Sequence, residues 1–342
     1  MKTCATVGIR PGVLALCLAI LAFLTPAVAG DPTEPEPLAL SSKAVQLDPN
    51  APTRQGIGRL SWRGGIEISS SKSRFGGLSG LLVSPDGAKL LAVSDAGRWL
   101  SATLSYDSEG RLTGIGDARM ARLQDLDGGA LKKKRWRDAE SLARLADGSI
   151  LVSFEHKHRI WRYGPQEAPL EGRPAKWPKP KGLDKAPDNG GLEALVALAD
   201  GRLLALTEGQ TNGTGTAGYL WHSDAWSSVT YRPHMAFKPT AASRLPGSDD
   251  LLVMERAFQP LSGPRVRLVR LAAGDIRPGA ELQGEELARW GLPLTVDNFE
   301  ALATRRGPGG ETLIYLLSDD NFNERQRTLL MLFALEDSPA AP

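Results

Sequence analysis

The sequence has few cysteines, no long apolar run and no excess of one charge, and each shortage excludes a class of protein. Its two cysteines, Cys4 and Cys17, lie near the start, which leaves no framework for a disulfide-stapled scaffold. The apolar run Val13–Leu24 is about 12 residues long, and a membrane-spanning helix needs roughly 20. There are 41 basic and 39 acidic side chains, so the basic excess of a nucleic-acid-binding protein is absent. Heptads and a Gly-X-Y period are also lacking, which excludes a coiled coil and collagen.

The residues that are present are typical of a globular protein with many turns. Hydrophobic residues make up 42% of the chain and charged residues 23%, which is enough for a sizeable core. There are 37 glycines and 24 prolines, as a fold of many short strands requires. The composition therefore favours a β-rich globular protein.

The first 29 residues have the three parts of a Sec signal peptide. Lys2 and Arg10 are the positive charges, Val13–Leu24 is the apolar segment, and Ala27-Val28-Ala29 precedes a cleavage point before Gly30. We therefore expect a periplasmic or secreted protein, with no transmembrane segment after cleavage. Both cysteines would be removed with the leader.

The rest of the chain divides into three parts. Residues 30–55 are rich in proline and predict a flexible arm. Residues 56–336 show no comparable break and predict one domain, and residues 337–342 form a short tail. A monomer is the default expectation.

An internal repeat occurs five times within this domain. Each copy has a short apolar strand, a tight turn that often contains Asp-Gly, a second apolar strand and then a carboxylate. The copies are Ser79–Asp95, Glu140–Glu155, Glu193–Glu208, Thr240–Glu255 and Glu300–Asp319.

The spacing of the repeats predicts an all-β fold, a β-propeller with five blades, or six if one blade is degenerate. Successive copies start 47 to 61 residues apart, close to the length of one four-stranded blade. The run Arg59–Ser70 precedes the first copy and has no blade of its own, so we expect this N-terminal strand to join the last blade and close the ring. A β-sandwich is the alternative architecture.

The repeat also predicts a ring of carboxylates at one end of the central channel. The start of the first strand and the end of the second lie at the same edge of an antiparallel hairpin. Oxygen ligands without cysteine favour Ca²⁺ or Mg²⁺, and we take Ca²⁺ as the candidate ion. Alternatively, each carboxylate caps a turn or pairs with a neighbour such as Arg98, Lys157 or Arg256. The predicted metal ligands are Asp95, Glu140, Glu155, Glu193, Glu208, Glu255, Glu300 and Asp319.

Other polar residues near these carboxylates are candidates for catalysis. His156 and His158 flank Lys157, and on a strand their spacing would place both rings on one face. With Arg256 they would face a substrate anion, beside Glu140 and Glu155. The catalytic candidates are therefore Glu140, Glu155, His156, His158 and Arg256. Lys132–Arg137 (KKKRWR) is either a solvated loop or the lip of an anion site.

Four segments resemble the phytase-like ("esterase-like activity of phytase") domain family of secreted bacterial proteins. They are GGLSGLLVSPDGAKLLAVSDAG at Gly76–Gly97, RDAESLARLADGSILVSFE at Arg137–Glu155, GGLEALVALADGRLLALTE at Gly190–Glu208 and DNFEALA at Asp297–Ala303. The resemblance implies a propeller and hydrolysis of phosphate or other esters. Two functions therefore stay open: a metal-assisted hydrolase of a small anionic ester, and a non-catalytic propeller that binds a ligand or an envelope partner.

Overall fold

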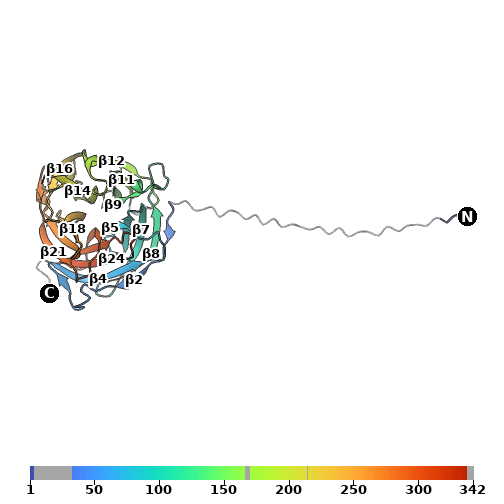
Figure 1. The fold of residues 1–342 in the computed structure, drawn as a ribbon, viewed down its shortest axis with the longest axis horizontal. Helices are drawn as coiled ribbons and strands as arrows, with labels where there is room; N and C mark the ends of the chain where they lie inside the picture. The colour runs from blue at the N-terminus through green and yellow to red at the C-terminus, as the bar shows by residue number, and fades with distance from the viewer. Residues whose placement is uncertain (4–32, 166–169, 214, 337–342) are drawn as a thin grey trace. The chain divides into compact units, whose positions relative to one another are not determined.

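The computed structural model describes residues 1–3, 33–165, 170–213 and 215–336. Five β-sheets are arranged around a central axis, each with its first strand innermost (Figure 1). The innermost strands of neighbouring blades contact one another all the way around the ring. The predicted β-propeller is confirmed, and it has five blades rather than six.

Each blade is built on four antiparallel strands, and blades 1, 3 and 5 have an additional strand at the outer edge. From the inside outwards, blade 1 contains β5 (Leu78–Val83), β6 (Lys89–Ser94), β7 (Arg98–Tyr106), β8 (Leu112–Arg122) and β1 (Glu36–Pro37). Blade 2 contains β9 (Ala139–Arg144), β10 (Ser149–Phe154), β11 (Arg159–Pro165) and β12 (Ala175–Trp177). Blade 3 contains β13 (Leu192–Ala197), β14 (Leu203–Asn212), β15 (Gly215–His222), β16 (Ala225–Tyr231) and a parallel edge strand, β20 (Glu281–Leu282).

The last two blades follow the same order. Blade 4 contains β17 (Lys238–Arg244), β18 (Leu251–Gln259), β19 (Gly263–Leu271) and β21 (Glu285–Gly291). Blade 5 contains β22 (Phe299–Arg306), β23 (Thr312–Ser318), β24 (Thr328–Leu335), β4 (Leu60–Ser69) and β2 (Ser41–Ala44), with β3 (Gly56–Ile57) paired to β4. The helical segments of the described chain are α1 (Lys134–Arg137) and the 3-10 turns η1 (Leu183–Lys185) and η2 (Ala273–Asp275).

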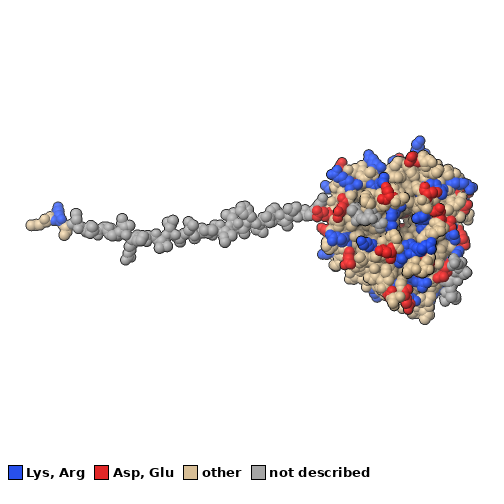
Figure 2. All heavy atoms as spheres, turned by 180° about the vertical axis from the view of Figure 1, so that it is seen from behind, with Lys and Arg blue, Asp and Glu red and all other residues tan. Residues whose placement is uncertain are grey.

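The hydrophobic core is divided among the interfaces between blades. Five clusters of buried apolar side chains each join neighbouring blades. Middle strands such as β10 and β24 are buried on both faces, which explains why their sequences are continuously apolar. The turns contain the expected glycines, and Gly87, Gly148 and Gly201 have φ angles of 79°, 82° and 85°. Basic and acidic side chains are interspersed over the face drawn in Figure 2.

The ring is closed by the N-terminal strand, as predicted. β4 pairs antiparallel with β24, so the last blade combines the start and the end of the propeller domain. This pairing gives β24 a neighbour on each side and removes the edge that an open ring would expose.

The proline-rich segment differs from the flexible arm that we expected. From Thr33 onwards it lies along the propeller, where β1 pairs with β8 and β2 pairs with β4. Leu38 and Leu47 are 4% and 1% exposed. Prolines do not prevent this docking, because an edge strand can do without some of its N–H donors. The proposed leader, apart from residues 1–3, and the tail lie outside the described residues. No helix in the described ranges is long and apolar enough to cross a membrane.

Candidate functional site

A β-bulge occurs at the same point of every innermost strand. In each of the five hairpins the pairing between first and second strand skips one residue of the first strand. A bulge turns the side chain of the extra residue away from the regular alternation. The skipped residues are Ser79, Glu140, Glu193, Thr240 and Glu300, which are the first residues of the five sequence repeats.

The carboxylates that end the second strands are held at the same end of the channel. In four blades, a backbone N–H just after the second strand donates to a carbonyl at the start of the same hairpin, two residues before the bulge residue, at 2.9 to 3.1 Å. The four donors are Asp95, Glu155, Glu208 and Asp319. This repeated bond places each terminal carboxylate beside the bulge residue of its own blade. The geometric basis for the predicted acidic mouth is therefore present in four of the five blades.

Three carboxylates of blade 2 form the tightest group. Asp138, Glu140 and Glu155 each offer an oxygen, and these oxygens lie within 4.8 Å of one another. A cation with oxygen ligands at about 2.3–2.6 Å needs ligands no farther apart than this. The triad could therefore hold a metal ion.

Asp138 is the member of this triad that the sequence analysis missed. Its carbonyl accepts the N–H of Glu155 at 2.9 Å, which fixes it beside that residue. The sequence did contain a signal for Asp138, because in the segment RDAES a second acid precedes the bulge residue Glu140 by two positions. His156 Nε2 lies 2.9 Å from Asp138 Oδ2, so an imidazole stands beside the triad.

Neighbouring carboxyl groups of the mouth share hydrogen bonds. Glu193 is bonded to Glu155, and Glu300 is bonded to Asp319. Burial, and then the charges of Glu140, Glu155 and Glu208, raise the pKa of Glu193 well above its usual value. Two carboxyl groups can share a hydrogen bond only when one of them keeps its proton, and the raised pKa values account for that.

The same causes act on the rest of the cluster, which we call the carboxylate cluster. Burial, followed by the charges of Asp138 and Glu300, raises the pKa of Asp95 to about 6. Burial, followed by the charge of Glu300, raises the pKa of Asp319 to about 9. Burial, followed by the charge of Glu155, raises the pKa of Glu140 well above its usual value. The cluster comprises Asp95, Asp138, Glu140, Glu155, Glu193, Glu208, Glu300 and Asp319.

Basic side chains lie near this cluster on two sides. Arg256 lies 3.2 Å from Glu300 and 3.6 Å from Glu208, and Lys238 lies 3.4 Å from Glu208. Around blade 2, the charges of Lys134 and Arg137 oppose the rise in the pKa of Asp138. Asp95 Oδ1 is buried and has no hydrogen-bond partner among the described residues, so it is an unsatisfied acceptor of the cluster.

The two histidines diverge, contrary to the expectation that they share one face. Residues 155–158 form the turn between β10 and β11 instead of a strand, and His156 has a φ of 50°. His156 contacts Asp138, whereas the buried His158 places Nε2 3.1 Å from the carbonyl oxygen of Pro187. Gly191 N donates to Glu155 Oε1 at 2.5 Å. A Cβ at Gly191 would lie 2.6 Å from His158 Nδ1, so only glycine fits between these side chains.

Glu255 lies inside blade 4 instead of joining the carboxylate cluster. Its carboxylate accepts hydrogen bonds from Tyr231 Oη at 2.6 Å and Arg267 at 2.7 Å, and its exposure is 0%. The bulge residue of this blade, Thr240, has no charge to pair with it. Ser79, the bulge residue of blade 1, donates its hydroxyl hydrogen to the carbonyl of Ala139.

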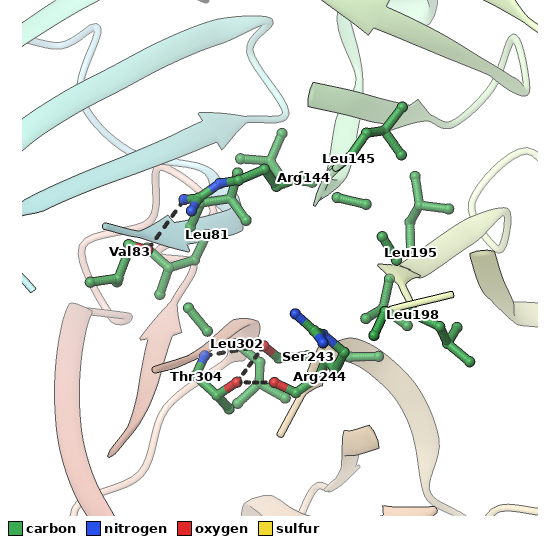
Figure 3. A pocket seen from close by; sticks show the side chains of 18 of the residues that line it. Leu81, Val83, Arg144, Leu145, Leu195, Leu198, Ser243, Arg244, Leu302 and Thr304 are labelled. Carbon is green, nitrogen blue, oxygen red and sulfur yellow. Dashed lines mark hydrogen bonds between the residues drawn. The ribbon is translucent and has the colours of Figure 1, made fainter. Parts of the chain in front are cut away.

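Beyond the mouth, apolar side chains of the innermost strands line a cavity of about 350 Å³. Figure 3 shows Leu81, Leu195 and Leu302 around it, with Arg144 and Arg244 at its edge. Arg144 donates to the carbonyl of Val83 at 3.2 Å. The lining of this cavity thus combines leucines with two arginines and carries none of the carboxylates of the mouth.

A five-bladed propeller with a carboxylate cluster at one channel mouth is the class of protein that this fold and site define. The model of the phytase-like family, described as esterase-like activity of phytase, matches residues 73–322. The chain belongs to this family. The match includes every residue of the carboxylate cluster.

Similar solved structures come from proteins of unlike activities. The catalytic domain of an alpha-L-arabinofuranosidase from Coprinopsis cinerea is 13% identical, with a TM-score of 0.48, and the alignment covers 83% of this chain and 99% of that one. A PQQ-bound aldose sugar dehydrogenase from Streptomyces coelicolor is 14% identical, with a TM-score of 0.42 and coverage of 89% and 100%. A catalytically inactive virginiamycin B lyase from Staphylococcus aureus is 12% identical, with a TM-score of 0.40 and coverage of 86% and 99%. No curated protein matches the sequence.

Proposed function

We propose that this protein hydrolyses phosphate or other esters at the carboxylate cluster with the help of a divalent cation, and that the cation is Ca²⁺. The observation that carries the proposal is the triad of Asp138, Glu140 and Glu155, whose oxygens converge within 4.8 Å. All three ligands are hard oxygen donors, the type that Ca²⁺ prefers. Membership of the phytase-like family supports the reaction class.

The cation would be held by the triad. When bound, it would supply Lewis-acid polarisation of the ester and a more acidic water. It would also balance the charges of these carboxylates. Without such balance, two like charges at about 4 Å cost roughly 4 kcal/mol at an effective dielectric of 20.

His156 is placed to move a proton at this site. Its Nε2 lies 2.9 Å from Asp138 Oδ2, and the ring would accept a proton from water or return one to a leaving group. The side chain is 24% exposed, so solvent and substrate can reach it. Arg256, beside Glu208 and Glu300, would face the anionic part of the ester.

The setting that we propose is outside the cytoplasm, with a monomer acting on a small anionic ester and with no nucleic-acid partner. The leader-like sequence of residues 1–29 supports export. The near balance of 41 basic and 39 acidic side chains supports the absence of a nucleic-acid partner. The competing proposal is a non-catalytic propeller in which the carboxylates are structural.

Metal analysis and ester hydrolysis separate the two proposals. We expect dialysed protein to retain Ca²⁺ and to hydrolyse 4-nitrophenyl phosphate or 4-nitrophenyl acetate, with the activity lost in chelator and restored by Ca²⁺. Glu140→Gln should abolish the activity, because it removes a charged ligand without changing side-chain volume. Glu109→Gln, which alters an exposed glutamate between β7 and β8, is the matched control. Hydrolysis that is absent, or unaffected by chelator and by Glu140→Gln, would favour the non-catalytic propeller.

A further inference from the structure

A second cavity, of about 690 Å³, lies on blade 2 outside the carboxylate cluster. Its volume is in the range of small-molecule sites. β11 and β12, which contribute to its wall, are the outer strands of this blade (Figure 1). The cavity is lined by Leu126, Trp136, His156, Lys157, His158, Arg159, Ile160, Trp161, Lys176, Trp177, Lys179, Asp184, Ala186 and Asp188. We call it the tryptophan–lysine cleft.

The charged groups of the cleft leave a surplus of positive charge. Lys157, Arg159, Lys176 and Lys179 face two acids, Asp184 and Asp188. Lys179 is paired with Asp184 at 2.5 Å. Lys157 and Lys176 are exposed and make no ion pair with any described residue, so their charges are available to an anion.

The aromatic walls of the cleft are fixed before any ligand arrives. The guanidinium of Arg159 lies over three rings, 5.2 Å from the centre of Trp136, 3.8 Å from Phe154 and 4.3 Å from Trp161. It also donates to the carbonyls of Trp136 and Lys157. This stack ties α1 to the turn between β10 and β11. The indoles are therefore held in place, and a ligand ring need not order them.

The opposite wall contains Trp177, which packs on Trp221 with ring centres 5.5 Å apart. Its Nε1–H is buried without a partner in the described part of the chain, and so is the Nε–H of Arg159. Both atoms are enclosed by the protein, so the contribution of these side chains to the cleft is the flat surface of the rings.

The cleft meets the carboxylate cluster at one side chain. His156 lines the cleft, and its Nε2 lies 2.9 Å from Oδ2 of Asp138 in the triad. An anion held by Lys157 and Lys176 would therefore lie next to the proposed proton-transfer residue, and its ring would extend along the tryptophans away from the carboxylates. The basic segment KKKRWR supplies Trp136 to this wall.

We propose that the tryptophan–lysine cleft binds a phosphate or phosphonate carried on an aromatic ring, and that it selects the alcohol part of the ester substrate. Binding by the cleft stands independently of catalysis, whereas its role in substrate selection rests on the proposed function. A flat ring gains contact with the indole faces, and the anion gains the two lysines. A ring without an anion would contact only the tryptophans, and an anion without a ring would contact only the lysines.

The test is calorimetric titration with phenylphosphonate, whose P–C bond is not an ester and is not hydrolysed. Chelator is present, so that a cation at the carboxylate cluster cannot hold the probe. We expect saturable binding that is at least about tenfold tighter than that of inorganic phosphate or benzyl alcohol. Lys157→Gln and Lys176→Gln should each weaken it about two- to fivefold. Trp136→Leu should weaken it about tenfold.

Lys181→Gln is the matched control, because Lys181 is an exposed lysine of the same connection that does not line the cleft. Circular dichroism melts confirm that each variant is folded. Undetectable binding of phenylphosphonate overturns the proposal, and so does binding that inorganic phosphate equals or that the cleft variants leave unchanged.

Kinetics separate this proposal from the proposed function. If the protein hydrolyses 4-nitrophenyl phosphate, Lys176→Gln should raise KM about two- to fivefold and leave kcat unchanged. If no hydrolysis is found but phenylphosphonate binds as described, the proposed function fails and the binding site stands. An unchanged KM in an active Lys176→Gln variant overturns the selection of substrate by the cleft.

Discussion

Glu193 is the bulge residue at which a substitution best separates stabilisation by a shared proton from stabilisation by a bound cation. It is hydrogen-bonded to Glu155, and burial raises the pKa values of both carboxyl groups, so the pair retains a proton. Glu193→Gln keeps a donor of the same size, so we expect the free energy of unfolding in chelator to change by less than about 1 kcal/mol.

The same substitution should weaken stabilisation by Ca²⁺, because the amide cannot become an anionic ligand. Melting temperatures across a Ca²⁺ titration measure this, since a ligand that binds only the folded state stabilises it by an amount that grows with the logarithm of its concentration above Kd. A Ca²⁺ response equal to that of the unaltered protein would contradict the proposed cation.

Gly191 is the glycine that permits the close approach of His158 and Glu155. A Cβ at this position would lie 2.6 Å from His158 Nδ1 and 3.5 Å from Glu155 Oε1. We expect Gly191→Ala to destabilise the protein by about 1–3 kcal/mol, as overpacking of a buried site does. Denaturant unfolding measures it. Gly274→Ala, where nothing lies within 4 Å of the added carbon, should be close to neutral.

The positions of the candidate site residues could be predicted from the sequence only where their side-chain neighbours belong to the same repeat. Glu140 and Glu155 were predictable, because a hairpin brings its two ends together. The position of Glu255 was not, because its partners Tyr231 and Arg267 come from neighbouring strands, and nothing in the repeat marks them. The turn that separates His156 from His158 was missed because a hairpin turn is only a few residues long.

Among the secondary-structure elements, the edge strands differ in how strongly the stability of the fold depends on them. β1 and β2 lie on the outside of blades 1 and 5 and add to sheets that are already complete. Leu38, in the connection between them, is buried. A chain lacking residues 33–45 should therefore fold and lose about 2 kcal/mol, the value of one buried leucine. A chain lacking residues 59–70, and with them β4, should fail to fold as a monomer.

Thermal unfolding and size-exclusion chromatography of the two truncated chains test this contrast. A stable monomer without residues 59–70 would show that β4 is not needed for closure. Equal damage from both deletions would show that β1 and β2 matter as much as the closing strand.

The edge elements also show where prediction from sequence fails. The closing strand was predicted because its alternation of apolar residues left one strand unassigned. The docking of residues 33–45 was not, because proline content describes the isolated chain, whereas burial of Leu38 and Leu47 depends on surfaces built by distant strands. The five repeats predicted five blades, since each copy contains a complete hairpin, but a sixth, degenerate blade was excluded only by the structure.

For the whole molecule, the raised pKa values predict how stability depends on pH. A carboxyl group whose pKa is higher in the folded than in the unfolded state stabilises the fold at low pH, and this contribution is lost as the pH rises through the folded value. The pKa is about 6 for Asp95 and about 9 for Asp319. In chelator, the melting temperature should therefore fall by several degrees from about pH 5 to about pH 9.

Calorimetric melts at these pH values, with and without Ca²⁺, measure the effect. Asp319→Asn should flatten the pH dependence in chelator, because an amide has no proton to lose. Ca²⁺ should stabilise the protein more at pH 9 than at pH 5, since the ion binds the ionised cluster. A melting temperature in chelator that rises with pH would contradict the pKa assignment.

The pairing of β4 with β24 also sets the order of events in folding. Ser61, on β4, donates a hydrogen bond to Glu336, which lies 275 positions later in the sequence. β4 can therefore pair only after the last residues of the domain have been synthesised. Contacts of such long range make folding slow. The ring therefore stays open until the whole domain has been synthesised. A chain that ends prematurely in blade 5 keeps four complete sheets and still has no partner for its beginning.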